Sequence, residues 1–159
     1  MTSFNVAIAQ WRLGRLRSTE LPEIATAALE RGLDSPALRQ LAGLPNTADY
    51  DAVELLQRAA AELGTPIPDA RGAVLTIARS IAERIVNATL EPYEGARQIW
   101  GLWVDDFPDE LLVFVGSASL MEDYRVERLT DPATYDPFIA ACEDDIRQAA
   151  RALAGSVAV

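Results

Sequence analysis

The chain lacks histidine and lysine altogether, and these absences exclude several classes of active site. Without histidine, it cannot form a Ser-His-Asp or Cys-His catalytic group, nor a zinc, haem or di-iron site that needs a histidine ligand. Without lysine, it cannot form a Schiff base or a phosphate-binding loop of the G-x-x-x-x-G-K type. No motif commits the chain to a reaction, so its status as an enzyme stays open and a non-enzymatic role is favoured.

Cysteine and long apolar runs are also scarce. The single cysteine, Cys142, cannot form an internal disulfide, which agrees with a reducing compartment. No apolar run approaches the roughly 18 residues of a membrane span, and the first basic residues follow the apolar ones, the reverse of a secretory signal. Because 159 residues, 50% of them apolar, suffice for one core, we expect a single globular helical domain over residues 1–159, located in the cytoplasm.

The negative charge is concentrated in one part of the chain. Residues 104–146 contain 12 acidic residues and two arginines, which accounts for the whole net charge of −10. Such a field repels nucleic acid and anionic membranes, and it attracts cationic surfaces or divalent metals. We therefore expect a basic protein partner and neither a nucleic-acid nor a membrane partner.

Helical spacing dominates the hydrophobic pattern and predicts an all-α fold. Residues 69–90 repeat valine and isoleucine at helical intervals and are the expected long central helix. We predict a single irregular bundle of six to eight short helices around it. The apolar run LLVFVG, residues 111–116, fits a buried helix or a short strand, and the spacing that continues to Met121 favours a helix. The other expected helices are 22–31, 36–42, 49–63, 92–104 and 137–154.

Aromatic and acidic residues meet between residues 91 and 116. On a helix over 92–104, the side chains of Tyr93, Ala96, Trp100 and Trp103 share one stripe, which predicts at least one of the two tryptophans in the core. Phe107 follows in a loop among four carboxylates. An aromatic anchor ringed by charge is typical of a protein-protein hot spot. The predicted partner-binding residues are Trp103, Asp105, Asp106, Phe107, Asp109 and Glu110.

The first functional hypothesis is a non-enzymatic binding module that engages a basic protein through residues of about 100–145. In its acidity, its helical pattern and its lack of a catalytic signature, the chain is similar to bacterial neutralising or adaptor proteins such as toxin immunity proteins, by general character and not by a motif. That resemblance implies a partner that is blocked on binding. A homodimer through the aromatic residues is equally consistent with the pattern.

Two alternative functions stay open. Carboxylates on neighbouring helices could hold Mg²⁺ or Mn²⁺ in a hydrolase of a nucleotide or phosphate ester, whereas the first hypothesis needs no cofactor. Their spacing does not follow the pattern of acids three residues apart on successive helices, so a solvated acidic face competes with this interpretation. A helical bundle could also bind a small molecule in a pocket lined by Tyr93 and Trp100. The candidate metal ligands are Glu122, Asp123, Glu143 and Asp144.

Overall fold

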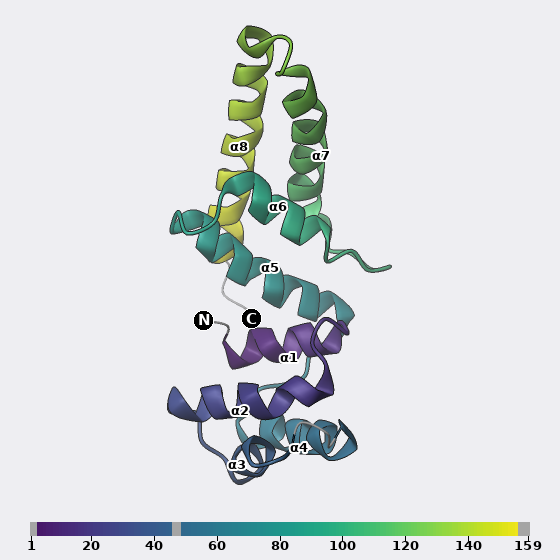
Figure 1. Cartoon of the computed structure of the whole chain (residues 1–159), viewed down its shortest axis with the longest axis vertical. Helices are drawn as coiled ribbons and strands as arrows, with labels where there is room; N and C mark the ends of the chain where they lie inside the picture. Colours follow the sequence, from purple (N-terminus) through teal and green to yellow (C-terminus); the bar gives the residue numbers. More distant parts are fainter. Residues whose placement is uncertain (1–2, 46–48, 156–159) are drawn as a thin grey trace. The chain divides into compact units, whose positions relative to one another are not determined.

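The computed structural model describes residues 3–45 and 49–155, and in these residues every regular element is a helix (Figure 1). They form eight α-helices and two short 3-10 helices, which confirms the all-α prediction. The run 111–116 is helical: the 3-10 helix η2 (Asp109–Leu111) leads directly into α7 (Leu112–Glu127), so the strand alternative is wrong. Within the described ranges, no helix has both the length and the apolar composition needed to cross a bilayer.

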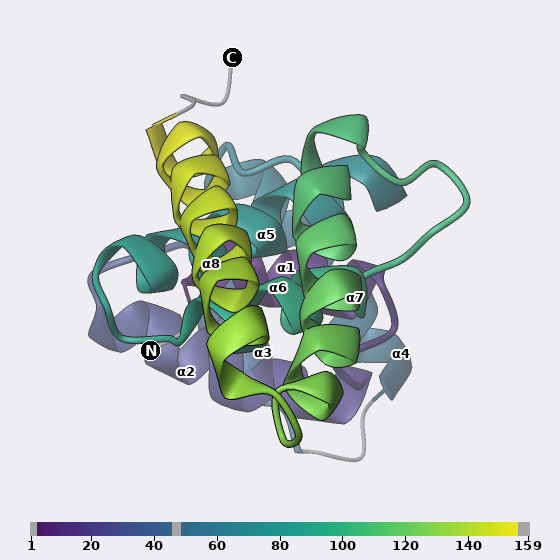
Figure 2. The ribbon, with the colours of Figure 1, turned by 90° about the horizontal axis from the view of Figure 1, so that it is seen from above.

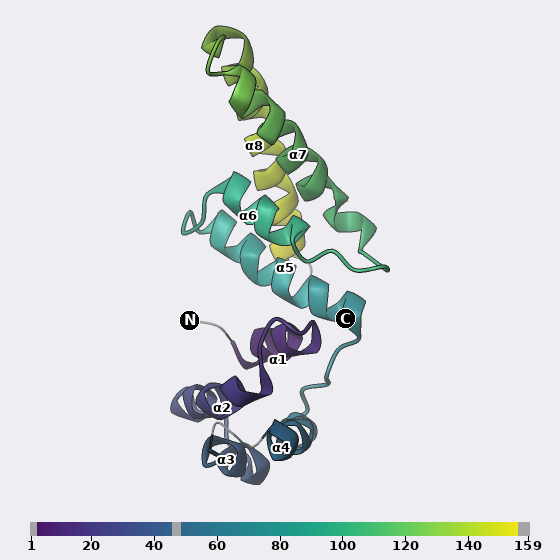
Figure 3. The ribbon, with the colours of Figure 1, turned by 45° about the vertical axis from the view of Figure 1, so that its right-hand side comes forward.

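The chain divides into two compact units, residues 1–76 and 77–159, and the division falls inside α5 (Ala70–Val86). In the first unit, α3 packs against both α2 and α4 (Figure 3). Its core consists of small and aliphatic side chains, with Leu38, Leu41 and Leu56 fully buried. The elements of this unit before α5 are α1 (Phe4–Arg12), η1 (Ser18–Glu20), α2 (Leu21–Glu30), α3 (Pro36–Ala42) and α4 (Asp49–Glu62).

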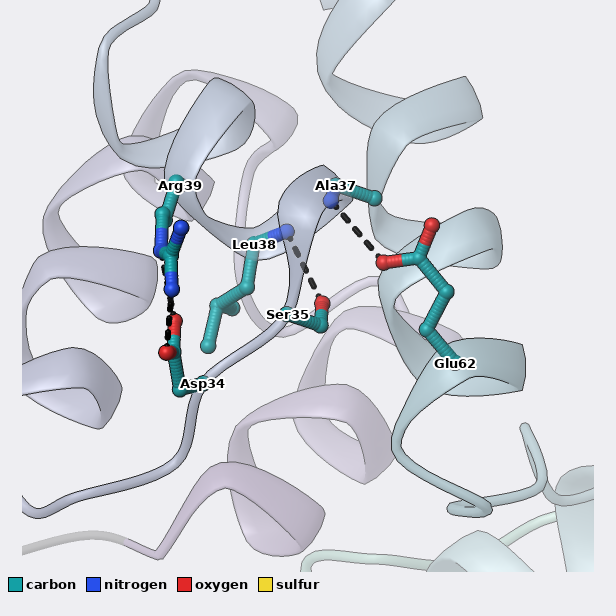
Figure 4. A network of polar contacts seen from close by, with 6 residues as sticks. All are labelled: Asp34, Ser35, Ala37, Leu38, Arg39 and Glu62. Atoms are coloured by element: carbon teal, nitrogen blue, oxygen red, sulfur yellow. Dashed lines mark hydrogen bonds and ion pairs between the residues drawn. The ribbon is translucent and has the colours of Figure 1, made fainter.

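A polar network fixes the start of α3 (Figure 4). Ser35 has extended backbone angles, and its hydroxyl accepts a hydrogen bond from the N–H of Leu38 (3.2 Å), as the serine before a helical proline predicts. The carboxylate of Glu62, at the end of α4, accepts a second hydrogen bond from the N–H of Ala37 (2.9 Å). Two of the free N–H groups at this helix start are thus satisfied, one of them by a residue 25 positions away.

The hydrogen bond from Ala37 to the Glu62 carboxylate should make the stability of the protein depend on pH, and Glu62→Gln should remove that dependence. That bond, then one from Ser35 and the charge of Arg58, lower the pKa of Glu62 from its ordinary value near 4.5. The ionised carboxylate therefore contributes its full stabilisation above about pH 4.5, and this stabilisation is lost as the pH falls toward the lowered pKa. Glutamine keeps an acceptor oxygen but cannot titrate. The free energy of unfolding, measured with urea, should therefore fall more steeply below about pH 4.5 for the native chain than for the variant.

A glutamate on the same helix serves as the control for this pH effect. Glu54 is exposed on α4, and Glu54→Gln makes the same change of side chain there, so unfolding of this variant over the same pH range separates the effect of the bond to Ala37 from that of removing one carboxylate. Parallel acid-dependence curves for the native chain and for Glu62→Gln would contradict the role of Glu62.

In the second unit, α7 and α8 (Pro132–Gly155) lie side by side as a helical hairpin, and α6 (Pro92–Trp100) contacts both (Figures 1 and 2). Cys142 is buried in α8, and this burial, together with the charge of Asp145, raises the pKa of its thiol. Toward the turn between the two helices, the rings of Tyr124, Tyr135 and Phe138 lie 5.5–6.4 Å apart. The largest fully buried side chains of this unit include Ile99, Leu111, Phe114, Met121 and Ile146.

The helix expected over 69–90 is shorter than predicted. α5 ends at Val86, and Ala88 has a left-handed φ of 53°. The N–H of Thr89 then bonds to the carbonyl of Arg84 (2.9 Å), as in helix ends that close on a left-handed residue. Glycine normally marks such an end, and no glycine stands here to signal it.

The last helix begins earlier than predicted, and at 24 residues it is the longest of the described helices. The hydrophobic pattern predicts a helix over 137–154. Instead α8 starts at Pro132, and Pro137 lies inside it. The carboxylate of Asp131 accepts a hydrogen bond from the N–H of Thr134 (3.2 Å), which caps the earlier start.

Candidate protein-interaction surface

The aromatic stripe predicted over 92–104 does not form, because α6 ends at Trp100. The next N–H groups make turn hydrogen bonds, from Gly101 to the carbonyl of Arg97 (2.9 Å) and from Leu102 to that of Ile99 (2.9 Å). Ile99 occupies the core position, while Trp100 is only partly buried and Trp103 is 57% exposed. The expectation that a tryptophan of this pair lies in the core is therefore wrong. The buried face of α6 consists of Pro92, Gly95, Ala96 and Ile99.

Trp103 stands in the loop after α6 and stacks on Phe107. The ring centroids lie 4.6 Å apart with an angle of 13° between the planes. Phe107 is only 7% exposed, and its neighbour Pro108 is fully buried, so the loop presents one aromatic ring and supports it with another. Stacking of this kind contributes about 0.5–1.5 kcal/mol beyond the burial itself. Trp103 is thereby ordered and yet more than half accessible.

Four carboxylates surround this aromatic pair along the chain, and all four are exposed. Asp109 and Glu110 lie in the first turn of η2, where a negative charge is favourable. Asp106 and Glu110 also take part in interactions within the chain. Asp105 and Asp109 are therefore the better pair for substitution. The structure thus brings five of the six predicted partner-binding side chains to the surface, and the sixth, Phe107, supports Trp103 from beneath.

Exposed apolar side chains gather in the same part of the chain as the negative charge. Of the ten large apolar side chains that are exposed in the described residues, seven fall between 103 and 138. A contiguous apolar surface rimmed by charge marks an interaction site more often than isolated apolar residues do, so those of the seven that share one helix face are the relevant ones. The seven are Trp103, Leu112, Val113, Leu120, Val126, Leu129 and Phe138.

The four candidate metal ligands lie on α7 and α8, and three of them have arginine partners. Glu122 is 3.4 Å from the guanidinium of Arg97. Arg147 pairs with both Glu143 (2.7 Å) and Asp144 (3.0 Å), and these bonds, that to Glu143 first, raise the pKa of Arg147. In the part of the chain that the structure describes, no three acidic or cysteine side chains converge on one point as metal ligands. The hydrolase with Mg²⁺ or Mn²⁺ stays a prediction.

The ring of Tyr93, which was expected to line a pocket with Trp100, lies against two arginine side chains. The guanidinium groups of Arg125 and Arg97 lie 4.4 Å and 5.8 Å from the centre of the Tyr93 ring, so two cations cover that ring. A hollow of about 320 Å³ occurs elsewhere, in the first unit, where residues of α1 and α2 line it. The spacing of the aromatics gave no signal for it. A small-molecule ligand stays a prediction.

Comparison with known proteins assigns no family to this surface. No family model, no curated protein and no solved structure matches the chain. The features of the chain that bear on its function are the stacked tryptophan, its acidic surroundings and the apolar side chains that follow them.

Proposed function

We propose that the protein is a non-enzymatic binding module of the cytoplasm, which engages a basic protein through the loop between α6 and α7, as neutralising, immunity-like or adaptor proteins do. The observation that carries this proposal is the exposed ring of Trp103, stacked on the buried ring of Phe107. An aromatic side chain that is already ordered loses little conformational freedom on binding, so more of its burial contributes to affinity. Tryptophan is also enriched among hot-spot residues.

The negative charge around Trp103 favours a partner with a positively charged surface. Asp105 and Asp109 are exposed close to it in the chain, and residues 104–146 carry the whole negative excess of the protein. Such a field accelerates the encounter with a cationic surface and slows that with an anionic one. Exposed charges are screened over about 8–10 Å at physiological salt, so the association rate should fall as salt is added.

The test is a pull-down from a lysate of the source organism with the native chain as bait, followed by kinetics with the captured protein. We expect a basic protein that is retained at low salt and released at high salt. Trp103→Ala should weaken its binding by about 2 kcal/mol or more, roughly 30-fold, because a central aromatic anchor is lost. Asp105→Asn with Asp109→Asn should lower the association rate and its salt dependence and leave the dissociation rate nearly unchanged.

Matched controls come from α4, which carries another exposed aromatic side chain and exposed acids. Tyr50 is 83% exposed, and Asp51 and Glu54 are exposed beside it. Tyr50→Ala and the pair Asp51→Asn, Glu54→Gln should leave binding unchanged. Capture that survives Trp103→Ala would overturn the proposal. So would the absence of a captured basic protein, or a Trp103-dependent dimer of this chain in its place.

A further inference from the structure

The first half of α7 is apolar on its outward side as well as on its core side. Phe114 and Met121 are fully buried, while Leu112, Val113 and Leu120 are 45%, 39% and 48% exposed. The last three share a side of the helix, because positions one, seven and eight residues apart fall within about 100° of each other. A helix that is apolar all round is normally covered all round. Among the residues that the structure describes, none covers Leu112, Val113 and Leu120 on the outward side of α7 to the extent that Phe114 and Met121 are covered on its core side.

A glycine lies in the middle of this outward side. Gly116 is exposed and lies on the same face as Leu112 and Leu120, one turn from each. No described atom outside its own stretch of helix comes within 4 Å of the position that a Cβ would occupy, and Gly116 is not among the glycines with positive φ. Glycine in a helix interior is less stable than alanine. Nothing in the described part of the chain requires glycine at this position, whereas a second backbone approaching closely would.

Acidic residues bracket the apolar side at both ends. Asp109 precedes Leu112 by three positions, and Asp123 and Glu127 follow Leu120 by three and seven positions, so all lie near one face. The two nearby cations are engaged elsewhere, Arg125 over the ring of Tyr93 and Arg128 with Asp136. A ligand for this face therefore needs apolar residues in its centre and cations toward its ends.

This charge pattern opposes a second copy of the same face. In an antiparallel pair of α7 helices, Asp123 and Glu127 of one copy would lie over Asp109 of the other. In a parallel pair, each acid would lie over its own counterpart. Like charges placed against one another across an interface cost up to several kcal/mol and so disfavour such a pair. A cationic helix meets the same acids favourably.

We infer that the outward face of α7 receives a cationic amphipathic helix, which packs its apolar side on Leu112, Val113 and Leu120 and brings its backbone close at Gly116. This inference rests on the proposed function, since it names the structure of the segment that a basic partner presents. Recognition of such a helix uses apolar anchors at helical spacing, with flanking charges that set orientation.

The probe is a synthetic, fluorescent peptide of about 18 residues composed of leucine and lysine. Its leucines are three and four positions apart, so that they share one face of a helix and the lysines occupy the other. The comparison peptide has the same composition in an order that spreads leucine around the helix. Fluorescence anisotropy at low salt with the full chain should show at least about tenfold tighter binding of the amphipathic peptide. Equal binding of the two peptides would overturn the inference, because charge alone would then explain it.

Gly116→Ala provides the sharpest variant, because its two expected effects have opposite signs. The free protein should melt at a higher temperature than the native chain, since alanine is the better helix former. Binding of the amphipathic peptide should weaken about tenfold, because the added Cβ keeps the two backbones apart. Unchanged peptide binding by this variant would overturn the inference, and the raised melting temperature shows that the variant is folded.

Leucine substitutions supply the matched pair. Leu120→Gln should weaken peptide binding about tenfold, because it removes an apolar anchor from the face. Leu129→Gln should not, although Leu129 is 85% exposed, because it lies beyond the end of α7 and off this face. An equal effect of the two substitutions would contradict the placement of the helix.

Failure of this inference and failure of the proposed function give different results. If the α7 variants leave both peptide binding and partner capture unchanged while Trp103→Ala abolishes capture, the α7 inference fails and the proposed function stands. If the peptide depends on Gly116 but no basic protein is captured, the proposed function fails and α7 remains a helix-binding face.

Discussion

Phe114→Ala should lower the free energy of unfolding by about 3–5 kcal/mol, the usual cost of removing a fully buried phenylalanine ring. Phe114 is 0% exposed on α7, which packs against both α6 and α8. The loss combines the transfer of the ring with the cavity left behind, and it is a large part of the stability of an ordinary domain. Urea unfolding followed by far-UV circular dichroism measures it.

A second residue on the same helix controls for this change. Leu112 is 45% exposed only two positions earlier, so Leu112→Ala should cost less than about 1 kcal/mol. If Phe114→Ala does not fold, Phe114→Leu keeps most of the apolar volume and should cost about 1.5 kcal/mol or less. Similar losses for Phe114→Ala and Leu112→Ala would contradict the placement of Phe114 in the core.

Alanine substitutions at two helical glycines of the second unit should change stability in opposite directions. A Cβ at Gly95 would lie 2.5 Å from Cδ1 and 2.8 Å from Cγ1 of Ile85, which is 5% exposed and has little room to move. Gly95→Ala should therefore destabilise by about 1–3 kcal/mol, the usual cost of overpacking. Gly116→Ala meets open space and should stabilise by about 0.5–1 kcal/mol. Thermal and urea unfolding of both variants give the two signs.

The overpacking at Gly95 can be checked by a compensating change. Ile85→Val removes Cδ1, the atom closest to the added Cβ. Combined with Gly95→Ala, it should cost less than the sum of the two single changes, because the two side chains share the same space. If Gly95→Ala were more stable than the native chain, the close contact between Gly95 on α6 and Ile85 on α5 would be contradicted.

Local signals in the sequence placed the helices that have them. Ser35 and Pro36, a capping residue followed by a helical proline, mark the start of α3, and Gly64, with its φ of 63°, stands just beyond the end of α4. The spacing through Met121 identified the helix at 111–116. Caps, glycine stops and hydrophobic periods act over a few neighbouring residues, so a single sequence contains them. Ala88 and Asp131 were missed because a left-handed alanine is rare and two prolines five residues apart offer two starts.

The candidate surface was predicted by its composition and not by its arrangement. Acidic and aromatic residues adjoin in the sequence, and this predicted partner-binding residues between Trp103 and Glu110. The sequence could not tell that Trp103 would be exposed and Phe107 buried, because that choice depends on which neighbours the loop meets when the chain folds. The end of α6 at Trp100 decided it by taking Trp103 off the helical stripe.

Composition and local periodicity are enough to establish the all-α class, the acidic character and the exclusion of histidine and lysine chemistry, because neither depends on the fold. The packing of the folded chain places Gly95 against Ile85 and leaves Gly116 facing open space, and nothing in the sequence distinguishes these two helical glycines. The same packing joins Glu62 to the N–H of Ala37, 25 residues away. Burial and long-range hydrogen bonds arise when distant segments pack, and that packing is absent from any short stretch of the chain.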